Sequence, residues 1–451
     1  MSSHFRFRLL SLFVSLSFLT SAFLHAQEHG EVYRYARKIV DTLCSPSMHG
    51  RGYVNNGDKV AAKYLETQFA AAGLKNFHGT YDQKFSLNVN TFPGNGTFIG
   101  YRGMDKSFPM GETALVNCNS PACPETRAEI VWLDSTLLAS KKKREHFSKI
   151  DFTDKVLVID RKGVTDKDNL TFMDDMEKHY PLHVKGIVSF NSKRLMWDVA
   201  SKQAEVPSFE LLVPDSVHNT IKKQMEESAY LNFSVESKMM EDYRTQNIIG
   251  YIEGSQQPDS FIVFSAHYDH LGQIGDPIYF PGANDNASGC AMLLNLIRYY
   301  SMPGHQPKCS IAFIAFGAEE AGLVGSKYYT DHPLFPLRQI KFLVNMDIMG
   351  TGDEGITVVN GTIFPEAFKN LQAINDKAHY LPEVKIRGKA ANSDHYFFSE
   401  KGVPSFFIYT RGGIKAYHDI YDKAETLPLT KFEDVFSLLI AFENSLESPP
   451  K

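Results

Sequence analysis

Cysteine is scarce in this sequence, with five residues among 451. The odd number and the low density exclude a scaffold that depends on a framework of disulfide bonds. No two cysteines have the C-x-x-C spacing typical of a thiolate metal site. Cys118 and Cys123 are near enough in sequence to close a small loop, whereas Cys290 and Cys309 lie in apolar segments and are expected to be small buried side chains.

Concentrated basic charge is also missing. The formal net charge is −5, and no basic stripe or alternation of basic and aromatic residues occurs, so we do not expect nucleic acid as a partner. The short run at 141–144 is typical of a solvated helix face. The apolar content of 43% and charged content of 22% are ordinary for a globular protein, and the length suits two domains better than one core.

Long apolar runs are confined to the N-terminus. Arg6 and Arg8 precede an apolar stretch at 9–24, and Ala26 is followed by polar residues. This order of basic, apolar and small residues predicts a signal peptide over 1–26, cleaved after Ala26, and therefore export to the periplasm or the extracellular space. An uncleaved membrane anchor is the alternative, disfavoured because the stretch is short for a span. We expect no stable membrane insertion after cleavage.

The remaining chain divides into a main domain, at 27–110 and 238–451, and an inserted domain at 111–237. In the first part we expect helices at 31–43 and 59–72, a loop with Gly50-Arg51-Gly52, and a strand near 81–89. The insert shows short strands separated by helical stretches, with no cluster of His, Asp and Glu at strand ends. Its expected strands are 129–133, 155–160, 186–190 and 206–209.

From residue 247 strands alternate with helices. This alternation predicts an α/β fold with a mostly parallel central sheet and helices on both faces, to which the insert adds a smaller β-rich α+β domain. The expected strands are 247–253, 261–267, 309–316, 341–347 and 404–409, and the expected helices include 290–300, 364–378 and 429–446.

Polar side chains follow each buried strand of this region. In open α/β sheets ligands bind beyond the carboxyl ends of the strands, so these side chains should converge on one edge. Between the first two strands lies a turn-rich loop, 282–289, that opens a helix. The converging residues are His267 and Asp269 after the first strand, Asp285 in the loop, Glu319 and Glu320 after the second strand, Asp347 after the third and His418 after the fourth.

Each of these residues by itself has an ordinary structural interpretation, such as a helix cap or a solvated helix start. Together, several carboxylates at one edge would repel one another unless a cation neutralised them. A mixture of imidazoles and carboxylates suits Zn²⁺ better than Mg²⁺ or Ca²⁺, which prefer oxygen ligands. Two ions fit the ligand count if one carboxylate bridges. The predicted ligands are His267, Asp285, Glu320, Asp347 and His418.

The order of these motifs resembles that of the M28 peptidases, the dizinc aminopeptidases and their relatives, over about 50–95 and 243–446. The insert resembles, more loosely, a protease-associated domain. The resemblance implies a zinc exopeptidase fold of the phosphorylase/hydrolase-like type. The motifs that carry it are Ala266-His267-Tyr268-Asp269-His270-Leu271-Gly272, Gly282-Ala283-Asn284-Asp285-Asn286-Ala287-Ser288-Gly289, Gly317-Ala318-Glu319-Glu320-Ala321-Gly322-Leu323, Asn345-Met346-Asp347, Ser393-Asp394-His395 and Tyr417-His418-Asp419.

The resemblance also implies roles for these residues. Asp285 would bridge two zinc ions, with His267 and Asp347 completing one site and Glu320 and His418 the other. Glu319 would be the general base in the removal of N-terminal amino acids from peptides by zinc-activated water. Asp269 would accept a hydrogen bond from His267 and orient it, while His270 receives no role.

One feature departs from the family pattern. Some members place a tyrosine just before the Ser-Asp-His motif, where this chain has Ala390 and Ala391. We expect His395 or Tyr409 to take the place of that tyrosine and to contact the substrate.

Three other functions stay open at this point. A glutaminyl-peptide cyclotransferase has the same fold with one zinc ion, a carboxypeptidase occurs in the same family, and a binding module without activity is a different class. The sequence Asn286-Ala287-Ser288 matches a glycosylation acceptor, which we interpret as a chance match because a glycan there would block the site.

Overall fold

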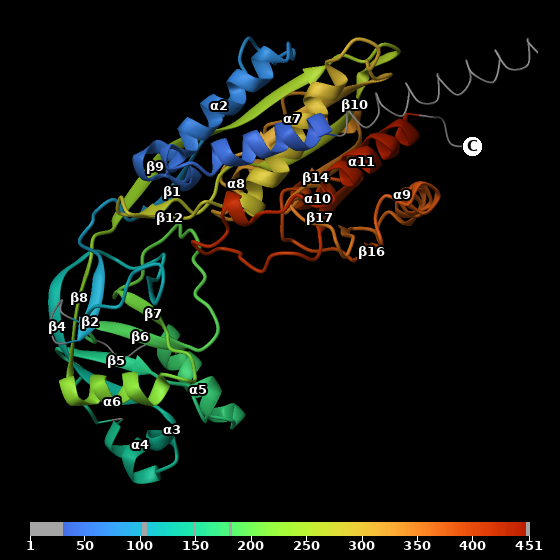
Figure 1. Ribbon diagram of the computed structural model, residues 1–451. Helices are drawn as coiled ribbons and strands as arrows, with labels where there is room; N and C mark the ends of the chain where they lie inside the picture. Colours follow the sequence, from blue (N-terminus) through green and yellow to red (C-terminus); the bar gives the residue numbers. More distant parts are fainter. Residues whose placement is uncertain (1–29, 102–105, 148, 180–182, 448–451) are drawn as a thin grey trace, which may run out of the picture.

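The structure is a computed structural model that describes residues 30–101, 106–147, 149–179 and 183–447. The predicted signal peptide at 1–26 therefore lies outside the described residues. Two large β-sheets form separate parts of the molecule, and the smaller part is the mainly cyan and green region in the lower half of Figure 1. Within the described ranges, no helix has the length and apolar character needed to cross a membrane.

The larger part contains an eight-stranded mixed sheet. Its centre is parallel, with β10 between β13 and β14 and with β17 beside β14, while β1 and β9 run antiparallel at one side. This arrangement confirms the predicted mostly parallel sheet. In spatial order the strands are β1 (Asp82–Thr91), β9 (Lys238–Ile252), β13 (Cys309–Phe316), β10 (Gln257–His267), β14 (Ile340–Met346), β17 (Ser405–Thr410), β15 (Ile356–Val359) and β16 (Val384–Ile386).

Helices cover both faces of this sheet because its central strands are apolar on both sides. In β10, Ile262 and Phe264 pack into one hydrophobic cluster, whereas Phe261 and Val263 pack into another. The first cluster contains the helical residues 30–43 with α2 (Gly57–Ala71), α7 (Ser288–Tyr300), α9 (Pro365–Ala378) and α11 (Phe432–Leu446). The second contains residues of α8 (Val324–Asp331) and α10 (His395–Glu400).

The inserted part is built on a seven-stranded sheet. We expected the insert to begin at residue 111, but β2 already pairs with β8 in this sheet, so the second sheet begins earlier. In spatial order its strands are β2 (Phe98–Tyr101), β8 (Tyr230–Val235), β4 (Cys123–Leu133), β5 (Lys155–Ile159), β6 (Gly186–Asn191), β7 (Ser208–Leu212) and β3 (Ala114–Val116). Its helices are α3 (Ser135–Leu138), α4 (Lys141–Phe147), α5 (Lys167–Lys178) and α6 (His218–Ser228).

The remaining elements are short. Cys118 and Cys123 are free thiols, so the small loop between them is not closed by a disulfide. The short strands and helical turns are β11 (Gln273–Ile274), β12 (Ile278–Tyr279), η1 (Pro46–Arg51), η2 (Val54–Asn56), η4 (Ala283–Ala287), η5 (Leu337–Gln339) and η6 (Ala424–Thr426).

A buried carboxyl group between α7 and α11 makes the stability of this domain depend on pH. The Tyr300 hydroxyl donates a 2.9 Å hydrogen bond to Oε2 of Glu443, which is 1% exposed. Burial, aided by the nearby Glu447 carboxylate, raises the pKa of Glu443 from 4.5 to about 8. Because the pKa of Glu443 is higher in the folded state, its protonation contributes to the free energy of unfolding. This contribution is complete below about pH 4.5 and is lost as the pH rises to about 8.

We therefore expect Glu443→Gln to raise the melting temperature by a few degrees at pH 8.5 and by much less at pH 5, since about 1 kcal/mol corresponds to about 2–4 °C in domains of this size class. Thermal unfolding at the two pH values measures this difference. Glu366→Gln is the matched control, because that carboxylate is exposed and paired with Lys369. An equal change at both pH values for Glu443→Gln would contradict the assignment.

Candidate metal centre

The central parallel strands deliver the candidate ligands to one edge of the large sheet. His267 is the last residue of β10, and Glu319 and Glu320 follow β13, whose Phe316 is in register with His267. Asp347 directly follows β14, and His418 lies in the loop after β17. The predicted convergence occurs because parallel strands end at the same edge.

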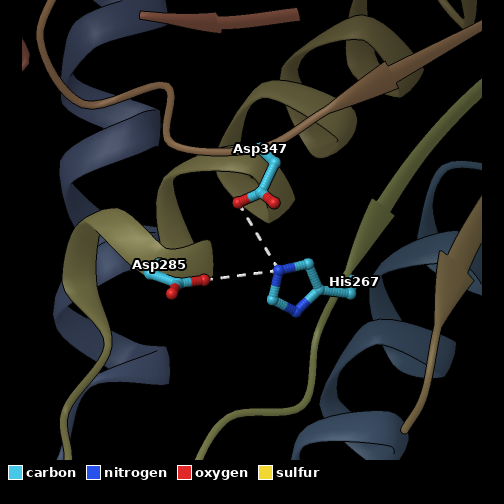
Figure 2. Close-up of side chains that lie close together, drawn as sticks. All are labelled: His267, Asp285 and Asp347. Atoms are coloured by element: carbon cyan, nitrogen blue, oxygen red, sulfur yellow. Dashed lines mark ion pairs between the residues drawn. The ribbon is translucent and has the colours of Figure 1, made fainter. Parts of the chain in front are cut away.

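One group of ligand atoms surrounds the ring of His267, as Figure 2 shows. Its Nε2 atom lies 3.3 Å from Oδ1 of Asp285 and 3.4 Å from Oδ1 of Asp347. All three residues are buried, and one atom from each lies within the distance expected for shared coordination of an ion. Asp347 Oδ1 is buried without a hydrogen-bond partner, which leaves a lone pair available to a cation.

A second group surrounds the ring of His418. Its Nε2 atom lies 3.2 Å from Oδ2 of Asp285 and 3.2 Å from Oε2 of Glu320. The two carboxylate oxygens of Asp285 therefore face different histidines. This is the arrangement that a carboxylate bridging two ions requires.

The buried carboxylates of the cluster need positive charge nearby to neutralise them. Burial would raise the pKa of Asp285, but its contacts with His267 and His418 outweigh burial and hold that pKa well below its usual range. Burial would lower the pKa values of both histidines, yet the surrounding carboxylates raise them well above the usual range. No Lys or Arg side chain of the described residues forms an ion pair with these carboxylates. The donor set therefore fits divalent cations, whose charge would replace the protons on the imidazoles.

Glu319 lies beside this cluster. Burial, together with the charges of Glu320, Asp394 and Asp347, raises the pKa of Glu319 well above its usual range. Its backbone N–H donates a 3.0 Å hydrogen bond to Oδ1 of Asp269.

Asp269 supports the site differently from our expectation. Its carboxylate Oδ1 is 3.9 Å from Nδ1 of His267, beyond hydrogen-bond length, while the backbone carbonyl of Asp269 is 3.2 Å from the same nitrogen. The carboxylate instead accepts hydrogen bonds from the backbone N–H groups of Glu319 and Glu320. The two-residue spacing correctly placed Asp269 beside His267, but the peptide groups after β13 are the better-placed donors for its side chain.

His270 belongs to the cluster, although the sequence analysis gave it no role. Its Nδ1 atom lies 2.7 Å from Oε1 of Glu320, and burial lowers its pKa, so a neutral ring can donate to that carboxylate. Together with Asp285 and Glu320 it forms a further group of possible metal ligands. The His-x-Asp-His pattern was the available signal, but an imidazole three residues beyond a strand has no predictable direction.

The two residues expected to contact substrate are not members of the ligand groups found among the described residues. His395 is fully buried with its ring against Phe407, so its side chain has no surface that a substrate could reach. Tyr409 is partly exposed, and its hydroxyl accepts a 3.3 Å hydrogen bond from Arg387.

A buried arginine holds the loop that carries Asp285. Arg51 is fully buried, and its guanidinium donates to carbonyl oxygens of Leu43, Tyr268, Pro281, Gly282 and Asp285. From the other side Asp422 accepts hydrogen bonds from the backbone N–H groups of Asn284 and Asp285. The sequence showed only a glycine-flanked arginine and an isolated aspartate, because, apart from Leu43, the partners are more than 130 residues apart in the chain.

Gly282 is required where Arg51 meets this loop. Its φ of +58° is in the left-handed region, and a Cβ atom there would lie 2.6 Å from the Arg51 guanidinium and 2.4 Å from the ring of His270. Only glycine therefore allows the close packing of arginine, histidine and loop.

The loop is also tied to the strand that precedes Asp347. The side chain of Asn286 donates to the Met346 carbonyl, and Asn284 accepts from the N–H of Gly350. Asn286 is fully buried with both ends of its amide engaged, so a glycan on Asn286 would not fit this structure.

The arginine contacts predict a specific variant. Arg51→Lys keeps the positive charge but lacks the planar fork that reaches five carbonyl groups. We expect metal affinity to fall about tenfold or more and the melting temperature of the metal-free protein to fall, because each unsatisfied buried carbonyl costs about 1–3 kcal/mol. Competition with a chelator and thermal unfolding measure the two effects.

The matched control is Arg298→Lys. In the wild type the Arg298 guanidinium pairs with Glu31 at the surface. This control should leave metal affinity unchanged. Wild-type metal affinity in Arg51→Lys would show that the loop does not depend on the guanidinium.

Comparisons with known proteins agree with this geometry. Residues 247–442 match the model of peptidase family M28. Aminopeptidase YwaD of Bacillus subtilis (strain 168) is 28% identical over 256 residues, 52% of this chain and 50% of that protein. A probable zinc metalloprotease of Pyrenophora teres f. teres (strain 0-1) is 34% identical over 128 residues, 27% of this chain and 26% of that protein. The chain thus spans half or less of the length of these curated relatives.

Solved structures share the fold over most of the chain. The zinc aminopeptidase BSAP from Bacillus subtilis has a TM-score of 0.65 at 19% identity, covering 91% of this chain and 93% of that chain. A peptidase M28 precursor from Shewanella amazonensis SB2B has a TM-score of 0.65 at 17% identity, covering 94% and 100%. These likenesses establish the α/β fold with its additional β-rich part. The segment at 247–442, which carries these motifs in order, is thus similar to peptidase family M28.

Proposed function

We propose that this protein is a metallo-aminopeptidase that removes N-terminal residues from peptides with the help of two zinc ions. The observation that carries the proposal is the carboxylate of Asp285, whose two oxygens face His267 and His418 separately. In this proposal Asp347 completes the ligands on the His267 side and Glu320 those on the His418 side. The family match and the activity named for YwaD support the same reaction.

The chain's own residues have distinct tasks in this reaction. When bound, the zinc ions would lower the pKa of a water molecule and polarise the scissile carbonyl group. The Glu319 carboxylate would accept a proton from the attacking water and pass it to the nitrogen of the leaving amine. Asp269 fixes the position of Glu319 through the hydrogen bond from the Glu319 N–H. Glu319 is partly exposed at the edge of the cluster, where a substrate can reach it.

An excess of acidic groups favours a substrate with a free amino terminus. The cationic amine of a peptide would be attracted to the carboxylates around the centre, and this attraction would limit cleavage to the terminal residue. We further propose that the protein is exported, because its N-terminal sequence has the order of a signal peptide, and that the insert is a protease-associated domain.

The donor geometry favours this function over a cyclotransferase. A single ion would need only one of the two ligand groups, whereas both groups are formed here and share Asp285. A carboxypeptidase would use the same centre, and the end of the peptide that is shortened distinguishes it. A panel of aminoacyl chromogenic substrates, with and without a chelator, tests the activity directly.

The general-base role predicts the behaviour of Glu319→Gln. The amide cannot accept the water proton, so we expect kcat to fall by at least about a hundredfold while bound zinc is retained. Steady-state kinetics and metal analysis of the same preparation measure both. Glu354→Gln, in the turn before β15, is a control that should retain activity. Activity near the wild-type level in Glu319→Gln would refute the assigned base.

The bridging role predicts a different result for Asp285→Ala. Both ligand groups lose a shared oxygen donor, so we expect the protein to release both ions and lose activity, while circular dichroism shows an intact fold. Metal content after dialysis against a weak chelator is the measurement. A variant that still holds two zinc ions would rule out the bridge.

A further inference from the structure

A loop of the inserted domain reaches the metal centre. Residues 192–207 connect β6 to β7, and the part around Trp197 lies against the segment that carries His418. The Trp197 N–H donates a 2.8 Å hydrogen bond to the His418 carbonyl, and the Arg194 guanidinium donates a 3.1 Å bond to the Lys415 carbonyl. The two domains therefore meet beside a proposed metal ligand.

Trp197 fixes the loop at this point. Its indole N–H donates a 2.8 Å hydrogen bond to the Val116 carbonyl inside the insert, while its ring stacks on Phe280 of the main domain at 4.8 Å. Phe280 lies two residues before Gly282, the start of the Asp285 loop. Contacts with both domains therefore fix Trp197. Trp197 in turn restricts where the residue that follows it can lie.

That next residue is Asp198, and its carboxylate contacts His418. Oδ1 of Asp198 lies 2.9 Å from Nδ1 of His418, while the opposite nitrogen, Nε2, points at Asp285 and Glu320. A hydrogen bond from Nδ1–H to the carboxylate selects the tautomer in which the Nε2 lone pair is free for a metal. The ring is also held by Tyr417, which stacks on it at 4.0 Å.

The other histidine is oriented without the insert. Nδ1 of His267 faces the backbone carbonyl of Asp269, which belongs to the same segment of the main domain. The two histidines therefore differ in the origin and the charge of their outer partner, since His418 has a carboxylate from a different domain.

We propose that Asp198 is a positioning residue through which the inserted domain completes the metal subsite of His418 and Glu320. The inference rests on the proposed function, because it assumes two metal subsites. It predicts that the two subsites respond differently to the loss of Asp198: the His418 subsite weakens, whereas the His267 subsite keeps its affinity. It also gives the insert a defined contribution to the centre, although its own strands carry no ligand.

The test measures metal binding rather than turnover. Wild-type protein and the variants Asp198→Asn, Asp198→Ala and Asp198→Glu are freed of metal and titrated with Co²⁺ alone, followed by its visible absorption. For Asp198→Asn and Asp198→Ala we expect one of two binding steps to weaken about 10- to 100-fold, the effect typical of removing an outer partner of a metal-bound histidine. Asp198→Glu, which keeps the carboxylate, should restore part of that affinity.

Two controls separate positioning from a structural role. Asp215→Asn removes an exposed carboxylate of the same domain that pairs with Lys162, and it should bind Co²⁺ like the wild type. The melting temperature of metal-free Asp198→Asn should equal that of the wild type, because Trp197 and Arg194 hold the loop through other contacts.

Each result has a distinct meaning. Two unchanged binding steps in Asp198→Ala, or equal weakening of both steps with a lower metal-free melting temperature, would overturn the positioning role. A wild-type protein that binds fewer than two Co²⁺ ions would contradict the proposed function itself and remove the second subsite with it. Two steps in the wild type and one selectively weakened step in the variants would support both.

Discussion

The crowding of negative charge around two imidazoles governs the structure at the carboxyl edge of the large sheet. Asp285, Asp347, Glu319 and Glu320 gather there, and among the described residues the ion-pair partners of Asp285, Asp347 and Glu320 are histidines. Carboxylates held so close in a buried place are unfavourable unless a cation neutralises them. The clustered carboxylates therefore need positive charge beside them, which divalent ions can supply. The surrounding groups hold the carboxylates in this arrangement.

A centre of this kind needs a rigid backbone, but Asp285 lies in the short turn η4, where its own φ and ψ are not helical. Buried peptide groups outside helices and strands must find other hydrogen-bond partners. Arg51 supplies donors to the carbonyl groups, Asp422 supplies acceptors for the N–H groups, and asparagine side chains tie the loop to the end of β14. The bridging carboxylate is thus positioned by residues from the beginning and the end of the chain.

The inserted domain also helps to hold a proposed metal ligand in place. The strands of its sheet carry none of the predicted ligands, but one loop packs on Phe280 and bonds to His418 through Trp197 and Asp198. The insert leaves and re-enters the main domain through the paired strands β1 and β9. A change in how the two domains pack would therefore alter the surroundings of a ligand.

The sequence by itself determined the central parallel strands of the large sheet, the helices α7, α9 and α11, and the identity of the charged residues at the strand ends. It could do so because apolar runs and helical periodicity are local, and because parallel strands necessarily end at one edge. The expected boundary of the insert was late, since the short strand β2 carries little periodic signal. Only the tertiary structure decided which nitrogen of each histidine faces the carboxylates, which group orients His267, and that His270, Arg51, Asp422 and Asp198 belong to the site. These facts depend on side-chain directions and on contacts between residues far apart in the chain, and no local pattern encodes either.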